Sequence, residues 1–139
     1  MPKVLVASDA DWVRDHVRAA LSGPGFEVIE ATRGQDVRGL VDREEPDLAV
    51  VDMQIGNMGG MAVSLDLRLE AGAGRLYWLP ILLLLDRQAD RFLARSSAAD
   101  AMLVKPVDAG TLRRTVKNLL KLADDRQAAE DTAAAREVL

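Results

Sequence analysis

The chain has 139 residues, of which 49% are hydrophobic and 29% charged, and this balance predicts one soluble domain with a proper core. The net charge of −4 argues against nucleic-acid binding through a broad basic patch, because phosphate contacts need clustered Lys and Arg. No cysteine is present and His16 is the single histidine, which excludes disulfides, thiol catalysis and thiolate or multi-histidine metal sites.

No segment approaches the roughly 18 apolar residues that a membrane-spanning helix needs. The longest apolar run is LPILLLL at 79–85. The N-terminal sequence MPKVLVASD lacks the layout of a signal peptide, because polar residues follow the short apolar run at once. We therefore expect a cytoplasmic protein that does not associate with membranes.

Short apolar runs alternate with longer segments of helical periodicity along the chain. In chain order, the predicted elements are strand 3–7, helix 9–23, strand 26–31, helix 34–45, strand 47–51, helix 60–72, strand 80–85, a weaker helix 87–99, strand 101–105 and helix 108–125. Asp108 is placed to cap the last helix. Apolar strands between helices are typical of a parallel sheet covered on both faces. We predict an α/β fold with a doubly wound five-stranded parallel sheet, flavodoxin-like (βα)5, in strand order 2-1-3-4-5.

The last stretch, ADDRQAAEDTAAAREVL at 123–139, is rich in alanine and charge, and its helix propensity is high. We interpret it as a solvated extension of the last helix that frays; the alternative is a linker to an output domain or a partner-binding helix. The predicted division is therefore a domain at 1–122 and a helical extension or linker at 123–139.

Polar residues follow the apolar strands at the edge where the strand order switches. Ser8 and Asp9 end the first strand, Asp52 ends the third, and the Lys105–Pro106 pair ends the fifth. Burying an ionised carboxylate costs several kcal/mol unless a partner or a metal offsets it. Two carboxylates suit a hard divalent cation, and a lysine neutralises phosphoryl oxygens. Our hypothesis is that Asp52 is a nucleophile toward a phosphoryl group, forming an aspartyl phosphate.

With these residues in view, the chain resembles the receiver domain of two-component response regulators over residues 3 to about 122. In that family an acidic pair ends the first strand, where this chain has Ser8–Asp9. The phosphoacceptor ends the third strand and matches Asp52. A lysine followed by proline, usually with a cis bond, matches Lys105–Pro106.

Five positions depart from the family pattern. Ser8 replaces the first acid, and Gly56 replaces a proline in the loop after the phosphoacceptor. Leu85 stands where a Thr or Ser hydroxyl contacts the phosphoryl group, and leucine has no donor. Met102 replaces the aromatic residue that moves with that hydroxyl. Asp86 replaces a small residue, and its carboxylate would repel a phosphoryl group.

Several residues have more than one interpretation from sequence alone. Ser8 is either a water-mediated metal contact or a small polar filler. Asp9 is favoured as a metal ligand over a helix cap. Asp86 is favoured as a solvated loop acid or a cap of the next helix, over a partner of Lys105. His16 is expected to be structural, and Tyr77 and Trp78 either cover a sheet edge or form a contact patch.

The resemblance implies phosphorelay signalling. Asp52 would accept a phosphoryl group from a histidine kinase or a phosphotransfer protein, and Lys105 would stabilise its charge. Mg²⁺ would be held by Asp9, Asp52 and the backbone carbonyl of Gln54. Any enzymatic activity would be at most autocatalytic transfer to Asp52.

The resemblance also implies an output domain or partner protein, and a possible homodimer through the face formed by 87–99, 101–105 and 108–125. The alternative function is a pseudo-receiver, which is a phosphorylation-independent protein–protein interaction module. The missing hydroxyl, aromatic residue and acid favour the alternative, whereas Asp52 and Lys105 oppose it.

Overall fold

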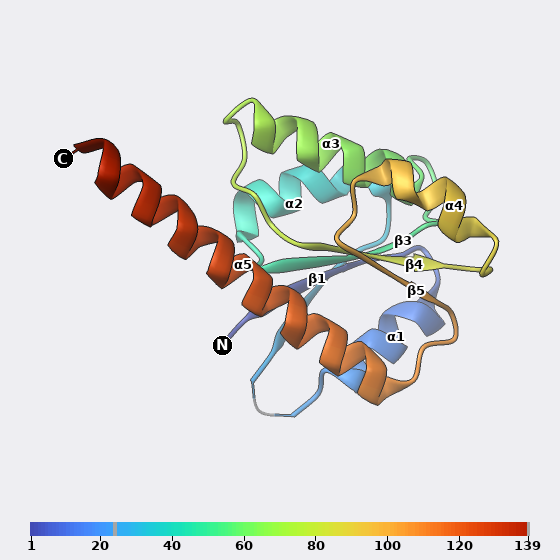
Figure 1. Ribbon diagram of the computed structural model, residues 1–139. Helices are drawn as coiled ribbons and strands as arrows, with labels where there is room; N and C mark the ends of the chain where they lie inside the picture. The colour runs from blue at the N-terminus through green and yellow to red at the C-terminus, as the bar shows by residue number, and fades with distance from the viewer. Residues whose placement is uncertain (24, 139) are drawn as a thin grey trace.

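The computed structural model describes residues 1–23 and 25–138, and they form a five-stranded sheet (Figure 1). The strands are β1 (Lys3–Ala7), β2 (Glu27–Ala31), β3 (Leu48–Asp52), β4 (Ile81–Leu85) and β5 (Ala101–Val104). Neighbouring strands are all parallel, in the order β2-β1-β3-β4-β5. The predicted fold class and strand order are confirmed.

The helices lie between the strands, as the apolar pattern predicts. They are α1 (Asp11–Ala20), the 3-10 turn η1 (Gly34–Asp36), α2 (Val37–Glu44), α3 (Gly60–Gly72), α4 (Asp90–Ala94), the 3-10 turn η2 (Arg95–Ser97) and α5 (Ala109–Val138). The prediction of one helix over 87–99 is wrong in extent. The Asp90 carboxylate accepts a bond from the backbone N–H of Arg87, which starts the helix late, and Ala98 has a left-handed conformation that ends it.

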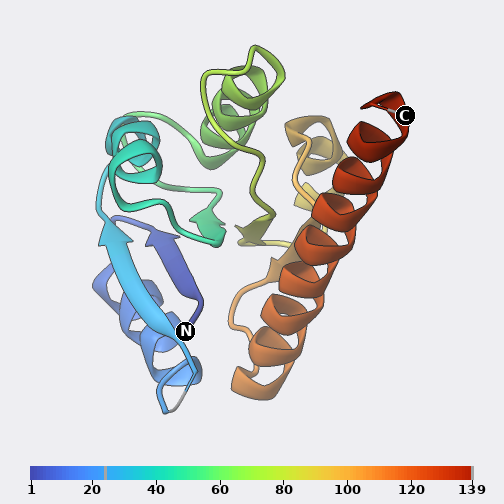
Figure 2. The same cartoon turned by 90° about the vertical axis from the view of Figure 1, so that its left-hand side faces the viewer.

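Two helical layers cover the sheet. Helices α1 and α5 lie on one face, and α2, α3 and α4 lie on the other (Figures 1 and 2). Alternate residues of each strand point to opposite faces. In β1, Val4 and Val6 pack in the core under α1 and α5, whereas Leu5 and Ala7 pack under α2 and α3. The sheet is therefore buried on both faces, and its carboxyl edge is left for polar side chains.

Helix α5 continues without a break through residues 123–138, and its last turns extend beyond the rest of the fold (Figure 1). Its start is capped as predicted, because the Asp108 carboxylate accepts a hydrogen bond of 3.0 Å from the Thr111 backbone N–H. That bond and the Thr111 hydroxyl lower the pKa of Asp108. Residues 124–137 are exposed, while Leu139 lies outside the described residues. The division at 122 remains a prediction.

Across residues 1–23 and 25–138, none of the helices has the length and apolar character required to cross a membrane.

Candidate functional site

Asp52 is the last residue of β3 and lies at the carboxyl edge of the sheet, with only 2% of its surface exposed. Its Oδ2 accepts a hydrogen bond of 2.8 Å from the Ser8 hydroxyl. Its Oδ1 accepts bonds from the backbone N–H of Gln54, at 3.1 Å, and from the Lys105 ammonium, at 2.7 Å. Three donors therefore compensate the burial of this carboxylate.

Lys105 follows β5 and reaches back to Asp52 with 8% of its side chain exposed. Its Nζ is also 2.8 Å from Oδ1 of Asp86. Burial of the ammonium lowers its pKa, but the hydrogen bonds to Asp52 and Asp86 more than offset this, so the pKa of Lys105 is raised. The peptide bond to Pro106 is cis, as the family resemblance implies.

Ser8 is fully buried and touches the candidate phosphoacceptor directly, which neither sequence interpretation anticipated. The register of β1 and β3 pairs Ala7 with Val51, so the next residues, Ser8 and Asp52, come side by side. The Ser8 hydroxyl also accepts a bond of 3.1 Å from the Ala10 backbone N–H. The contact could have been predicted from the parallel pairing of β1 with β3, which places the residues after the two strands next to each other.

Asp9 is exposed, and its Oδ2 accepts a 3.0 Å hydrogen bond from the backbone N–H of Gly56. It does not cap α1, where Ala10 occupies the N-cap position without a side-chain bond. A proline at position 56 would lack this N–H, so the departure from the family pattern makes the contact possible. A Cβ added to Gly56 would lie 2.9 Å from the same carboxylate oxygen.

The preferred interpretation of Asp86 is wrong. The residue is neither a free loop acid nor a helix cap, because it pairs with Lys105 and the N-cap position of α4 is Ala89. The Asp86 side chain remains 41% exposed, so it reaches Lys105 from the solvent side of the site.

The two positions of the expected switch are apolar and packed. Leu85 is fully buried, and its carbonyl accepts a bond of 2.7 Å from the backbone N–H of Lys105. Met102 is half-buried against the core beneath α4. No side-chain donor is therefore available at the end of β4.

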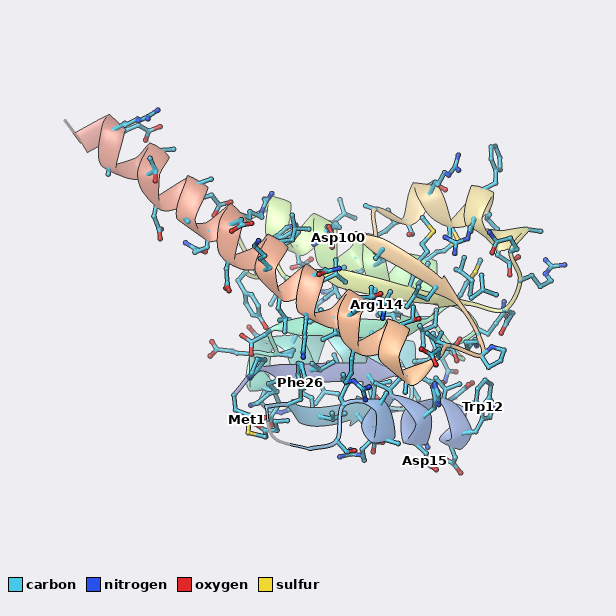
Figure 3. All side chains as sticks on the ribbon, turned by 60° about the horizontal axis from the view of Figure 1, so that its bottom comes forward. Met1, Trp12, Asp15, Phe26, Asp100 and Arg114 are labelled. Carbon is cyan, nitrogen blue, oxygen red and sulfur yellow. The ribbon has the colours of Figure 1, made fainter. Side chains whose placement is uncertain are left out.

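An aromatic side chain that the sequence did not single out lies beside the site. The Trp12 ring is 5.8 Å from the Lys105 ammonium and is 56% exposed. Figure 3 shows Trp12 at the N-terminal end of α1. Nearby, the ring Nε2 of His16 hydrogen-bonds to the carbonyl of Val107, which agrees with a structural role for the histidine.

Tyr77 and Trp78 lie away from the site and tie segments of the fold together. The Tyr77 hydroxyl donates a bond of 2.6 Å to the carbonyl of Pro46. Two guanidinium groups contact the Trp78 ring, with Arg68 of α3 at 4.7 Å and Arg126 of α5 at 4.5 Å from its centroid. These contacts join the start of β4 to α3 and to the helical extension.

Asp9 and Asp52 have the carboxylate chemistry that a hydrated magnesium ion prefers, and their role as its ligands stays a prediction. Mg²⁺ keeps several waters and binds proteins through one or two carboxylates together with substrate phosphates. Asp9 and Asp52 supply two carboxylates, and the residue at Ser8 supplies none. The described part of the chain contains no group of three or more His, Cys, Asp or Glu arranged to hold a metal. Gln54 contacts Asp52 through its backbone N–H, so its carbonyl role stays a prediction.

Comparison with known proteins gives one consistent family. A family model described as "Response regulator receiver domain" matches residues 4–117. An uncharacterized response regulatory protein of Mycobacterium tuberculosis is 34% identical over 125 residues, which cover 86% of this chain and 91% of that protein.

Two further relatives are longer. A probable transcriptional regulator of Porphyridium aerugineum is 30% identical over 124 residues, covering 88% of this chain and 49% of the relative. The transcriptional regulatory protein AfsQ1 of Streptomyces coelicolor is 31% identical over 123 residues, covering 87% and 52%. The chain thus spans about half the length of these two relatives.

Solved structures agree in fold. The chemotaxis response regulator CheY4 of Vibrio cholerae has a TM-score of 0.75 and 25% identity, covering 86% of this chain and 98% of that one. The BeF3-activated N-terminal receiver domain of RstA from Klebsiella pneumoniae has a TM-score of 0.73 and 26% identity, covering 85% and 97%.

Proposed function

The chain belongs to the family of response regulator receiver domains of two-component signalling, and from this premise we propose that it accepts a phosphoryl group on Asp52 with Mg²⁺ present. The observation that carries the proposal is the contact of 2.7 Å between Asp52 and the Lys105 ammonium at the carboxyl edge of the sheet. The donor is a histidine kinase or a phosphotransfer protein, whose phosphohistidine is the chemical class that this family uses.

In the proposed reaction, an Asp52 carboxylate oxygen attacks phosphorus and a new P–O bond forms. The bond between phosphorus and the donor nitrogen breaks, and the donor histidine keeps the electron pair. Lys105 neutralises the added charge as a point charge already in place. The backbone N–H of Gln54 holds the attacking carboxylate in a fixed orientation.

Asp9, Asp52 and the carbonyl of Gln54 are the groups that would hold Mg²⁺. The ion, when bound, supplies further neutralisation of the phosphoryl oxygens. Ser8 contributes a hydroxyl that donates to Asp52 and not an anionic ligand, so this set is one carboxylate short of the family pattern. We therefore expect Mg²⁺ to bind more weakly than it does at a site with the full acidic pair.

The alternative, an interaction module that needs no phosphorylation, has no support from the comparisons, whose relatives are named as response and transcriptional regulators. The longer relatives leave room for an output segment, so we also propose that signalling ends in a partner or an output domain. The homodimer through α4, β5 and α5 stays a proposal too.

The proposal is tested by incubating the purified chain with acetyl phosphate and Mg²⁺ and measuring its intact mass. We expect one phosphoryl adduct, which disappears with EDTA and in Asp52→Asn. The Asn variant is a matched control because it keeps the shape of the side chain. An adduct that persists in Asp52→Asn would contradict the proposal, and so would the absence of any adduct.

A further inference from the structure

Asp86 forms an ion pair with the Lys105 ammonium, which is the group that would neutralise a phosphoryl group on Asp52. The residue follows the last residue of β4, and its Oδ1 lies 2.8 Å from Lys105 Nζ. The same Nζ lies 2.7 Å from Asp52. Lys105 therefore joins two carboxylates before any phosphoryl group has arrived, and both contacts are at salt-bridge distance.

The two departures at Ser8 and Asp86 are complementary in charge. The site loses a carboxylate at the end of β1 and gains one just beyond β4. The site therefore has the same formal charge as the family pattern. It contains three carboxylates, Asp9, Asp52 and Asp86, and one ammonium, Lys105. One acid has moved from the side where a metal would bind to the side of Lys105.

We propose that Asp86 is a built-in counter-ion of Lys105, which an incoming phosphoryl group must displace, and that it thereby limits the rate at which Asp52 is phosphorylated. This inference rests on the proposed function. It assigns Asp86 as a positioning residue, because it acts on the phosphoryl group through the lysine.

The burial of the two carboxylates decides which one gives way. Asp52 is 2% exposed and also bonded to Ser8 and Gln54, so its release from Lys105 would leave it inside the protein. Asp86 has 41% of its side chain in solvent, and water can replace the ammonium as its partner at little cost. Displacement therefore releases Asp86.

Release of Asp86 would also allow a movement at the active site to reach α4. The next residue, Arg87, is bonded to Asp90 through its backbone N–H at 3.1 Å and through its guanidinium at 2.9 Å. Asp90 is the first residue of α4. Leu85 has no hydroxyl to follow the phosphoryl group, so the movement available at the end of β4 is that of Asp86 and the turn it begins.

The experiment compares the initial rate of adduct formation from acetyl phosphate and Mg²⁺ in five proteins: the unmodified chain, Asp86→Asn, Asp86→Ala, Asp86→Glu and Asp42→Asn. Removing the charge at 86 should raise the rate about tenfold, the scale of one partly screened charge next to the reacting group. Asp86→Glu should stay slow because it keeps the charge. Asp42 is exposed on α2, so Asp42→Asn changes the net charge equally and should leave the rate unchanged.

Each outcome bears on the proposal. Equal rates in the unmodified chain and both neutral variants would overturn the inference while leaving phosphorylation intact. A fast Asp86→Glu would show that charge is not the cause, and would overturn it too. No adduct in any protein would refute the proposed function and this inference together. Asp86→Asn is nearly isosteric, so it serves if Asp86→Ala unfolds at a lower temperature.

Discussion

Asp52 shows at the scale of single residues how a charge is kept inside a protein. Its two oxygens receive bonds from a hydroxyl, a backbone N–H and an ammonium, each from a different segment of the chain. Lys105 is the strongest of these donors because it is charged. The Asp52 carboxylate is thus held in one orientation. The first carboxylate of the family's acidic pair is absent, because Ser8 stands at that position.

We expect weak binding of Mg²⁺ because Ser8 supplies a hydroxyl where the family has a carboxylate. Ser8→Asp would replace the Oγ–Oδ2 bond with a second carboxylate beside Asp52. Two carboxylates repel each other without a cation, so we expect lower stability in EDTA and tighter Mg²⁺ binding, by about tenfold or more. Isothermal titration with Mg²⁺ measures the affinity.

Asp52→Asn in the Ser8→Asp background is the matched control, and its Mg²⁺ affinity should fall back. If Ser8→Asp binds Mg²⁺ no better than the unmodified chain, then Asp9 and Asp52 do not form the metal site that we describe.

At the scale of elements, α5 contacts the segment that precedes β4 at a point beyond the part of the helix that packs on the core. The guanidinium of Arg126 lies 4.5 Å from the centroid of the Trp78 ring, and the guanidinium of Arg68 of α3 lies 4.7 Å from the same centroid. Arg68 is in turn paired with Asp100, just before β5. The start of the extension is therefore held by side chains of the domain.

Trp78→Ala tests this connection. Each cation–π contact contributes about 0.5–1 kcal/mol when exposed, so removing the ring should loosen the turns that follow residue 123. We expect faster amide hydrogen exchange in 123–138 and little change in α1. Trp12→Ala removes the other tryptophan and is the control. Unchanged exchange of the extension in Trp78→Ala would show that α5 holds its direction by helix propensity alone.

At the scale of the whole molecule, we expect alkaline pH to lower the stability of the fold through two groups, Lys105 and Tyr77. The pKa of Lys105 lies above its usual 10.5. The pKa of Tyr77 is raised mainly by burial of the hydroxyl and secondly by the charge of Asp47. A group with a raised pKa in the fold contributes stability that is complete below its unfolded pKa and is lost as pH rises through its folded pKa. Stability should therefore fall as pH rises above about 10.

Urea unfolding at pH 8 and at pH 11 measures this loss. Lys105→Met should be less stable at pH 8, by about 3 kcal/mol, because Asp52 loses its charged partner inside the protein. It should also lose less stability between the two pH values than the unmodified chain. Tyr77→Phe removes the second contribution. A Lys105→Met variant with the same loss on alkalinisation would contradict the role of the ammonium.

The sequence was sufficient to predict most of the architecture. Apolar runs fixed the five strands, and the order of βα units led to the observed sheet. Because the carboxyl ends of parallel strands share one edge, Asp52 and Lys105 were expected together, and they are in contact. The sequence favoured a loop acid or a helix cap for Asp86 over a contact with Lys105, because that contact depends on the path of the loop between β4 and α4. The bond from Ser8 to Asp52 depends on register in the same way.

The central claim is that Asp52, among the carboxylates at this edge, carries the phosphoryl group. Reduction with borohydride converts an acyl phosphate into the corresponding alcohol, which marks the modified residue permanently. The chain is treated with acetyl phosphate and Mg²⁺, reduced and digested with trypsin, and the peptides 4–14, 44–68 and 76–87, which contain Asp9, Asp52 and Asp86, are sequenced by mass spectrometry. We predict homoserine at position 52. Reduction at Asp9 or Asp86, or no reduced residue at all, would contradict the account.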